Sequence, residues 1–140
     1  MATQTDATIA DVIAVAEFRS ALRHFLRRSE KIARQSGLTP QRYTLLMMIK
    51  GAADGSEQST VTELADRMQL AQSTVTELVR RAESAGLIDR EQSQRDARVA
   101  HLRLTAEGER RLMLSFTELD KERAQLREAF VNLDGGVTGH

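Results

Sequence analysis

The sequence contains no cysteine and only one proline among its 140 residues. The absence of cysteine excludes disulfides, metal sites built from thiolates, and redox sensing by thiols. Apolar runs stay far below the roughly 20 residues that a membrane-spanning helix needs. The first residues also lack the basic and apolar segments of a secretory signal. We therefore expect a cytoplasmic protein with no membrane partner.

The sequence also lacks an excess of charge of either sign, because 20 Lys and Arg residues balance 20 Asp and Glu residues. A basic excess would have suggested a nucleic-acid partner, so this neutrality argues mildly against one. The charges are nevertheless unevenly placed. Residues 1–50 carry eight basic and four acidic residues, whereas residues 106–140 carry five basic and seven acidic residues. The two ends of the chain are thus complementary in sign.

The first half of the chain predicts three helices within about one domain. Apolar residues spaced by three and four predict a long helix over about residues 9–34, which Gly37 ends. Thr39 is a good N-cap and Pro40 suits the first helical position, so a second helix starts there. A capping box that starts at Thr60 begins a short third helix.

The next segments predict a helix-turn-helix followed by a hairpin. A tight turn after the third helix leads into a further helix that ends at Gly86. Two short strands are expected at residues 87–91 and 98–104. Thr105 then caps a last long helix to about residue 130, and we expect the glycine-rich tail after it to be disordered. The prediction is a mainly α fold with a small β-hairpin wing, a winged helix-turn-helix.

The second helix of the pair has a pattern that suits DNA recognition. Val75 and Val79 share its core-facing side. The opposite face and its flanks carry polar side chains that can contact base edges or phosphates: Gln72, Ser73, Thr74, Thr76, Glu77, Arg80 and Arg81. Glu77 could accept from a cytosine amino group, or pair with Arg80 or Arg81 as an ordinary helical ion pair. Any solvated helix shows such residues, so the helix alone leaves both interpretations open.

Three charged residues crowd the tip of the predicted hairpin: Arg95, Asp96 and Arg98. An arginine at such a tip can enter a minor groove, whose negative potential attracts it. Asp96 can accept hydrogen bonds from Arg98 or Arg95 and hold the guanidinium group in one orientation. The alternative is a polar turn, in which Asp favours the turn and the arginines keep an edge strand soluble.

Three stretches together span roughly residues 38–108: LTPQRYTLLMMI, VTELADRMQLAQSTVTELVRRAESAGLIDR and QRDARVAHLRLTAEG. In this order and spacing, the sequence resembles the multiple-antibiotic-resistance regulator (MarR) family of winged-helix transcription factors. The most specific element is Asp96-Ala97-Arg98 followed by LRLTAEG.

The resemblance implies a homodimeric regulator of double-stranded DNA, typically a repressor of a pseudo-palindromic operator released by a small anionic or aromatic ligand. Each subunit would place the helix from about Gln72 to Ala85 in a major groove and its wing in a minor groove. It also implies three segments of one compact chain: an N-terminal dimerisation helix (1–37), a winged helix-turn-helix lobe (38–104), and a C-terminal dimerisation helix with a flexible tail (105–140).

The sequence departs from the family pattern in three places. Ala71 stands where the family often has Ser, so an N-cap hydroxyl is missing that Ser73 could partly replace. Glu77 stands where a basic or amide residue is common, so it either reads cytosine or pairs with a neighbouring arginine. The chain also ends soon after the helix that starts at Thr105, where many members carry one further helix.

An arginine row lies on the first predicted helix at Arg19, Arg23 and Arg27, where like charges repel slightly. We hypothesise that acids of the last helix pair with this row, within or between subunits: Glu118, Asp120, Glu122 and Glu128. The alternative is a solvated basic face.

Four side chains on the first two helices form the candidate ligand pocket: His24, Arg28, Tyr43 and Met47. An anionic aromatic ligand could pair with Arg28 or His24 and pack on the other two side chains. The alternative is that an aromatic residue and a methionine at helical spacing simply belong to the core. The histidines lack ligand-like spacing, so we expect no metal and no cofactor.

Two other classes of function compete with the regulator. A winged helix could be a non-catalytic protein-interaction module without specific DNA binding. Zero net charge and Glu77 mildly favour this module, whereas the Asp96–Arg98 wing argues against it. An enzyme is not expected, because the sequence has no glycine-rich phosphate loop, no paired carboxylates in an apolar setting and no nucleophile–base pair.

Overall fold

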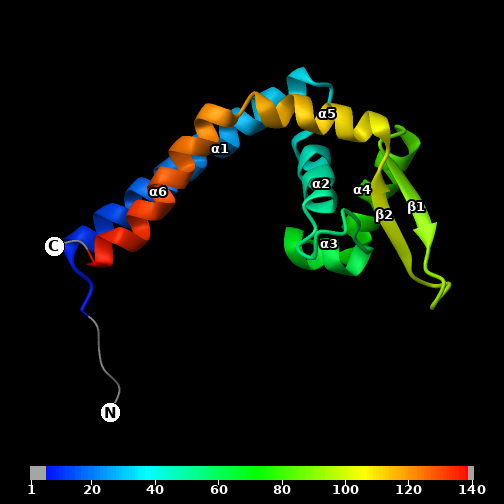
Figure 1. Ribbon diagram of the computed structural model, residues 1–140, viewed down its shortest axis with the longest axis horizontal. Helices are drawn as coiled ribbons and strands as arrows, with labels where there is room; N and C mark the ends of the chain where they lie inside the picture. Colours follow the sequence, from blue (N-terminus) through cyan, green and yellow to red (C-terminus); the bar gives the residue numbers. More distant parts are fainter. Residues whose placement is uncertain (1–5, 139–140) are drawn as a thin grey trace, which may run out of the picture.

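The computed structural model describes residues 6–138 and the side chains of residues 6–133. These residues form six helices and two strands: α1 (Ile9–Gln35), α2 (Pro40–Lys50), α3 (Val61–Met68), α4 (Gln72–Ser84), β1 (Ile88–Gln92), β2 (Ala100–Leu104), α5 (Ala106–Thr117) and α6 (Asp120–Thr138). Figure 1 shows a body built around α2 and a long arm made of α1 and α6. The predicted fold class, mainly α with a small β-hairpin wing, is confirmed.

Threonine hydroxyls start four of the helices. Each accepts a hydrogen bond from the backbone N–H three residues later: Thr8, Thr39, Thr60 and Thr105. Such a bond satisfies an N–H group that has no partner inside the helix, and its loss typically costs about 1 kcal/mol. The predicted helix starts at Thr39, Thr60 and Thr105 are therefore confirmed.

The core lies where α2 meets the helix-turn-helix and the hairpin. Its fully buried side chains come from almost every element of the body: Leu45, Leu46, Ile49, Leu64, Val75, Val79, Leu87 and Leu102. Helix α2 contacts α1, α3, α4, α5 and β2. Burial of one such side chain contributes about 1.5–3 kcal/mol, so this core fixes α4 and the hairpin relative to each other.

The hairpin is anchored at its base. Strands β1 and β2 pair antiparallel, with Ile88 opposite Leu104. The N–H of Ser59 donates to the carbonyl oxygen of Leu102 at 3.0 Å, and the N–H of Leu102 donates back at 2.8 Å. The segment before α3 therefore extends the pairing of β2, while the hairpin tip projects from the body (Figure 1).

The C-terminal part corrects the prediction of a single helix after Thr105. The chain forms two helices there, α5 and α6, with a break at residues 118–119. Leu119 is only 1% exposed, and the break keeps this side chain in the core. The further helix that we expected to be missing is therefore present as α6.

The predicted disordered tail is also wrong within the described residues, because α6 continues to Thr138. Helix propensity is a weak preference that tertiary packing overrides, and α6 packs along α1. Residues 139–140, the end of that predicted tail, lie outside the described residues.

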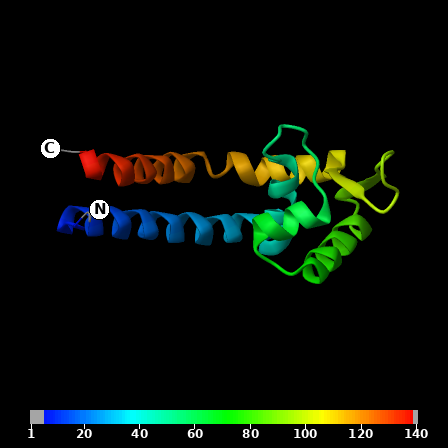
Figure 2. The ribbon, with the colours of Figure 1, turned by 90° about the horizontal axis from the view of Figure 1, so that it is seen from below.

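The arm consists of α1 and α6 lying antiparallel side by side (Figure 2). Phe18 and Phe130 pack edge to face with ring centroids 6.0 Å apart, and Arg28 Nε lies 3.4 Å from Glu122 Oε2. The arginine row is exposed and forms no ion pair with any other described residue. Pairing of the row with acids of α6 therefore does not occur within the described part of one subunit, and pairing between subunits stays a hypothesis.

None of the helices in residues 6–138 combines the length and the apolar character needed to cross a membrane.

Candidate nucleic-acid interface

A short turn between α3 and α4 sets the position of α4. Gln69 adopts the left-handed conformation with φ 54°, and the N–H of Leu70 donates to the carbonyl oxygen of Ala65 at 3.1 Å. This pattern closes the end of α3 and turns the chain within three residues. Helix α4 then buries Val75 and Val79 against the core.

The opposite face of α4 is open to solvent, as the sequence predicted. Glu77 on this face is half-buried. The other predicted side chains are exposed: Gln72, Ser73, Thr74, Thr76, Arg80 and Arg81. Short polar side chains occupy the N-terminal half and the arginines lie further along the helix. This order lets the N-terminal half approach another surface closely.

The start of α4 has no side-chain cap. Ala71 is the N-cap residue and cannot supply one. The side chain of Ser73, which we expected to replace it in part, forms no hydrogen bond with any described residue. The backbone N–H groups in the first turn of α4 therefore face solvent and carry the positive end of the helix dipole.

Glu77 pairs with both arginines that follow it on α4. Arg80 donates from Nε to Oε2 at 2.9 Å and from Nη2 to Oε1 at 2.5 Å. Arg81 donates from Nε to Oε1 at 3.1 Å. Hydrogen bonds from Arg80, and then from Arg81, lower the pKa of Glu77 from 4.5 to about 2. Of the two alternatives for Glu77, the structure contains the ion pair.

The wing tip holds Arg98 in the predicted way. Asp96 Oδ1 accepts from the backbone N–H of Arg98 at 3.0 Å and from its Nε at 3.2 Å. A further contact joins Arg98 Nη2 to Asp96 Oδ2 at 3.4 Å. These hydrogen bonds lower the pKa of Asp96 below its usual 3.8. The Arg98 side chain is nevertheless 91% exposed, so its outer N–H groups are free to meet a partner.

Two further features position this surface and escaped the sequence analysis. Ser93 Oγ accepts from the N–H of Arg95 at 3.2 Å, which shapes the loop before the arginine. A serine two residues before the arginine is a local signal that could have shown this. Arg90 donates to Glu83 at 2.8 and 3.2 Å and so ties β1 to α4. The sequence could not predict this ion pair from a helical or turn spacing, because the turn between α4 and β1 separates the two residues.

The four candidate ligand residues do not line one hollow. Arg28 pairs with Glu122 of α6, and His24 Nδ1 lies 2.8 Å from the carbonyl oxygen of Ser20. Met47 packs against the core. Only Tyr43 of the four lines the hollow of about 300 Å³ between α1, α2 and the end of α3. The helices turn these side chains toward different neighbours within the described part of one subunit, so their grouping in a ligand pocket stays a prediction.

The hollow beside Tyr43 has mostly apolar and hydroxyl-bearing walls: Leu26, Ser29, Glu30, Pro40, Gln41, Tyr43, Thr44, Met68 and Leu70. Tyr43 is 2% exposed, and its hydroxyl has no hydrogen-bond partner in the described part of the chain. Glu30 is the one charged residue among the lining residues. Within residues 6–138, no three histidine or acidic residues are grouped so that they could hold a metal ion.

The helix-turn-helix and most of the wing match a known family. Residues 36–99 match the model of the MarR family. Over these residues the chain is similar to the MarR family. The resemblance predicted from the sequence is therefore confirmed, and the match covers α4 and the Asp96–Arg98 pair.

Solved structures extend the similarity to the flanking helices. AbsC from Streptomyces coelicolor, a MarR family transcriptional regulator, is 22% identical with a TM-score of 0.62, covering 93% of this chain and 84% of that chain. Apo MarR from E. coli is 16% identical with a TM-score of 0.67, covering 89% and 86%. The M. tuberculosis transcriptional regulator MOSR, solved with DNA, is 27% identical with a TM-score of 0.58, covering 77% and 75%. The comparison with curated proteins gave no match.

Proposed function

We propose that the protein is a DNA-binding transcriptional regulator that binds a pseudo-palindromic operator as a homodimer and represses transcription. The observation that carries this proposal is the wing tip, where Asp96 orients an Arg98 side chain that is 91% exposed. An exposed guanidinium group that is already oriented loses little side-chain entropy when it docks. No residue is assigned a catalytic role.

In this proposal, α4 enters a major groove and the wing enters the adjacent minor groove. The short side chains at the start of α4 contact base edges, and the unpaired N–H groups of its first turn favour a phosphate. Arg98 enters the minor groove and Arg95 contacts the backbone. The structures of MOSR and of S. aureus MepR with DNA support this arrangement, because this chain shares their fold.

Exposed apolar side chains support the homodimer. Large hydrophobic residues remain exposed on all three helices that flank the winged helix: Ile9, Val12, Ile13, Val15, Leu26, Met113, Leu114, Phe130 and Val131. Large apolar side chains that stay exposed in such number are typically covered by a partner surface. A second copy that covers these residues would give the dimer two copies of α4.

The proposal predicts salt-dependent binding of a two-fold DNA site by a dimer. The wild-type protein should enrich a pseudo-palindrome from a random duplex library, with half-sites about 10 base pairs apart. With 6–10 phosphate contacts, affinity should fall by roughly 10³–10⁵ between 50 and 200 mM salt, which fluorescence anisotropy measures. Sedimentation equilibrium should give twice the chain mass of 15.6 kDa. No enriched sequence together with salt-independent binding would favour the protein-interaction module.

We further propose that the hollow beside Tyr43 binds a small uncharged aromatic molecule that modulates DNA binding. The supporting observations are its volume of about 300 Å³, its apolar walls and the Tyr43 hydroxyl. A hollow of this size suits a small ligand held by few polar groups. Glu30 carries a negative charge that would repel an anion, so an anionic ligand fits this hollow less well than a neutral one.

Phenol is a suitable probe of this hollow. At phenol concentrations about tenfold above its Kd, we expect the unfolding midpoint of the wild-type protein to rise by a few degrees. Leu26→Trp fills the hollow from a half-exposed position and should abolish that rise without unfolding the protein. Benzoate serves as the charged control and should have a smaller effect. Equal shifts in the wild type and the variant would place phenol elsewhere.

A further inference from the structure

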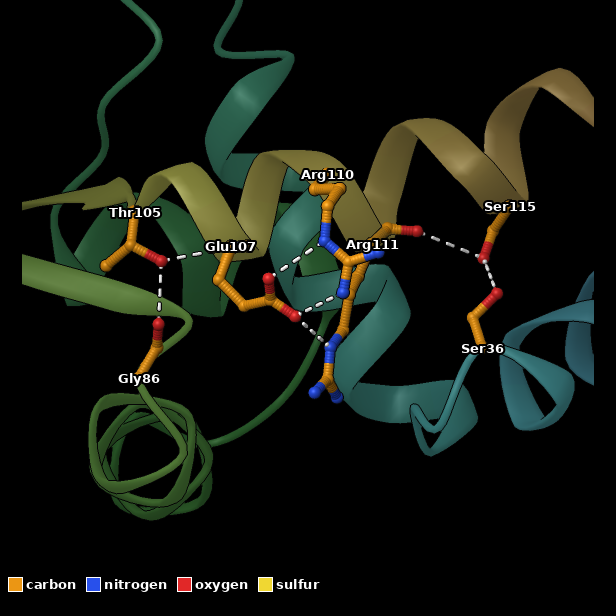
Figure 3. A network of polar contacts seen from close by, with 8 residues as sticks. Ser36, Gly86, Thr105, Glu107, Arg110, Arg111 and Ser115 are labelled. Carbon is orange, nitrogen blue, oxygen red and sulfur yellow. Dashed lines mark hydrogen bonds and ion pairs between the residues drawn. The ribbon is translucent and has the colours of Figure 1, made fainter.

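The chain contains the same five-residue charge pattern twice. Glu77 is followed by Arg80 and Arg81 on α4, and Glu107 is followed by Arg110 and Arg111 on α5. In both copies the glutamate accepts from Nε and Nη2 of the first arginine and from Nε of the second. Figure 3 shows the α5 copy, with the carboxylate of Glu107 between the two guanidinium groups. The two copies are therefore one local structure in two different places.

The surroundings of the two copies differ. The α5 copy belongs to a helix that packs against α2 and the end of α1, where Arg111 is only 34% exposed. The α4 copy lies on the open outer face of the recognition helix, where Arg80 and Arg81 are 63% and 61% exposed. Only the α4 copy can meet a partner along most of both arginine side chains.

The hydrogen-bond pattern leaves a particular edge of each α4 arginine free. A guanidinium group carries its donors in a rigid planar fork. Glu77 accepts from Nε and Nη2 of Arg80 and from Nε of Arg81, so the N–H bonds on the outer end of each guanidinium group point away from the carboxylate. Two parallel outer N–H groups match the O6 and N7 acceptors of guanine in a major groove. Without Glu77, each side chain would sample several rotamers before contact.

The carboxylate of Glu77 also weakens sequence-independent binding to DNA. A negative charge on the outer face of α4 repels phosphates and reduces the counterion release that drives non-specific binding. Glu77 remains charged at any neutral pH, because Arg80 and Arg81 lower its pKa to about 2. A residue that weakens general affinity while it orients two arginines raises the ratio of specific to non-specific binding.

We propose that Glu77 is a positioning residue that sets the base preference of α4 by aligning Arg80 and Arg81 for a G·C base pair. This inference rests on the proposed function, because it requires α4 to lie in a major groove. Glu77 itself does not contact a base in this arrangement.

The test compares Glu77→Gln with the matched control Glu107→Gln on the operator that the wild-type protein selects from a random library. Glu77→Gln should reduce the preference for this operator over a scrambled duplex about tenfold, the discrimination of one bidentate contact. Affinity for the scrambled duplex should stay the same or rise. Glu107→Gln should leave both affinities unchanged, and the unfolding midpoints of both variants should confirm that they fold.

A second arm separates positioning from direct readout of cytosine by Glu77. In an Arg80→Ala/Arg81→Ala background, a positioning residue has nothing to orient, so adding Glu77→Gln should change the operator preference no further. A persisting effect, or an exchange of one preferred base for another, would show direct readout and overturn the proposal. An unchanged preference in Glu77→Gln alone, or an equal loss in Glu107→Gln, would overturn it too. Failure of the wild-type protein to select any operator would instead refute the proposed function.

Discussion

Arg98→Ala is expected to weaken binding to the selected operator by about tenfold to a hundredfold. Arg98 is the more exposed member of the Asp96–Arg98 pair, and its guanidinium group is held in place by two contacts to Asp96. Its loss removes both a phosphate-neutralising charge and an oriented minor-groove contact. Fluorescence anisotropy at one fixed salt concentration measures the change.

Two neighbouring substitutions serve as controls for Arg98→Ala. Arg95→Ala removes the same charge from the same loop without an oriented side chain, so it should cost less and should weaken all DNA sequences alike. Asp96→Ala keeps Arg98 but releases it, so its effect should lie between those of the two arginine variants. An operator affinity that Arg98→Ala leaves unchanged would refute the assignment of the wing as a DNA contact.

Gly108→Ala is expected to destabilise the protein by about 2–4 kcal/mol, although alanine normally favours a helix. Gly108 lies in the first turn of α5 and is buried, and a Cβ atom there would lie 2.2 Å from the carbonyl oxygen of Leu87. That oxygen already accepts from the N–H of Thr105 at 3.0 Å, and Thr105 Oγ1 donates to the carbonyl oxygen of Gly86 at 2.7 Å. The helix start and the hairpin base would have to separate, so DNA binding should weaken as well.

Gly86→Ala is the control for this prediction. Gly86 has a φ of +75°, but a Cβ atom there would meet no other atom within 4 Å, so only backbone strain of about 1–2 kcal/mol opposes alanine at this position. Chemical denaturation gives the free energy of unfolding of both variants. It thereby compares the steric clash at Gly108 with the backbone strain at Gly86. A Gly108→Ala protein as stable as the wild type would contradict the close approach of α5 to the hairpin base.

Helix starts and short-range pairs were predictable because their geometry depends on residues a few positions apart. A threonine hydroxyl reaches the N–H three residues later in any helix, which is why Thr39, Thr60 and Thr105 could be placed. The same argument holds for Asp96 and Arg98, which lie two residues apart in a turn. For Glu77 the sequence left two alternatives open, contact with a cytosine or an ion pair with Arg80 or Arg81.

The C-terminal helices and the ligand pocket were not predictable in this way. The break between α5 and α6 depends on the burial of Leu119, and the continuation of α6 depends on its packing along α1. The sequence suggested that His24 and Arg28 of the first helix and Met47 of the second could face one ligand. In the fold these side chains turn toward different neighbours. Hydrophobic spacing gives the face of a helix and not the partner that covers it.

The sequence by itself determined the winged helix-turn-helix, the polar face of α4 and the arginine that the wing presents, because each follows from spacings within one helix or one turn. Only the tertiary structure decided that Glu77 holds Arg80 and Arg81, that α6 completes the arm, and that Tyr43 alone of the four candidates lines the hollow between α1, α2 and the end of α3. These outcomes depend on side-chain rotamers and on contacts between segments far apart in the chain. Long-range packing selects among alternatives that local patterns allow equally.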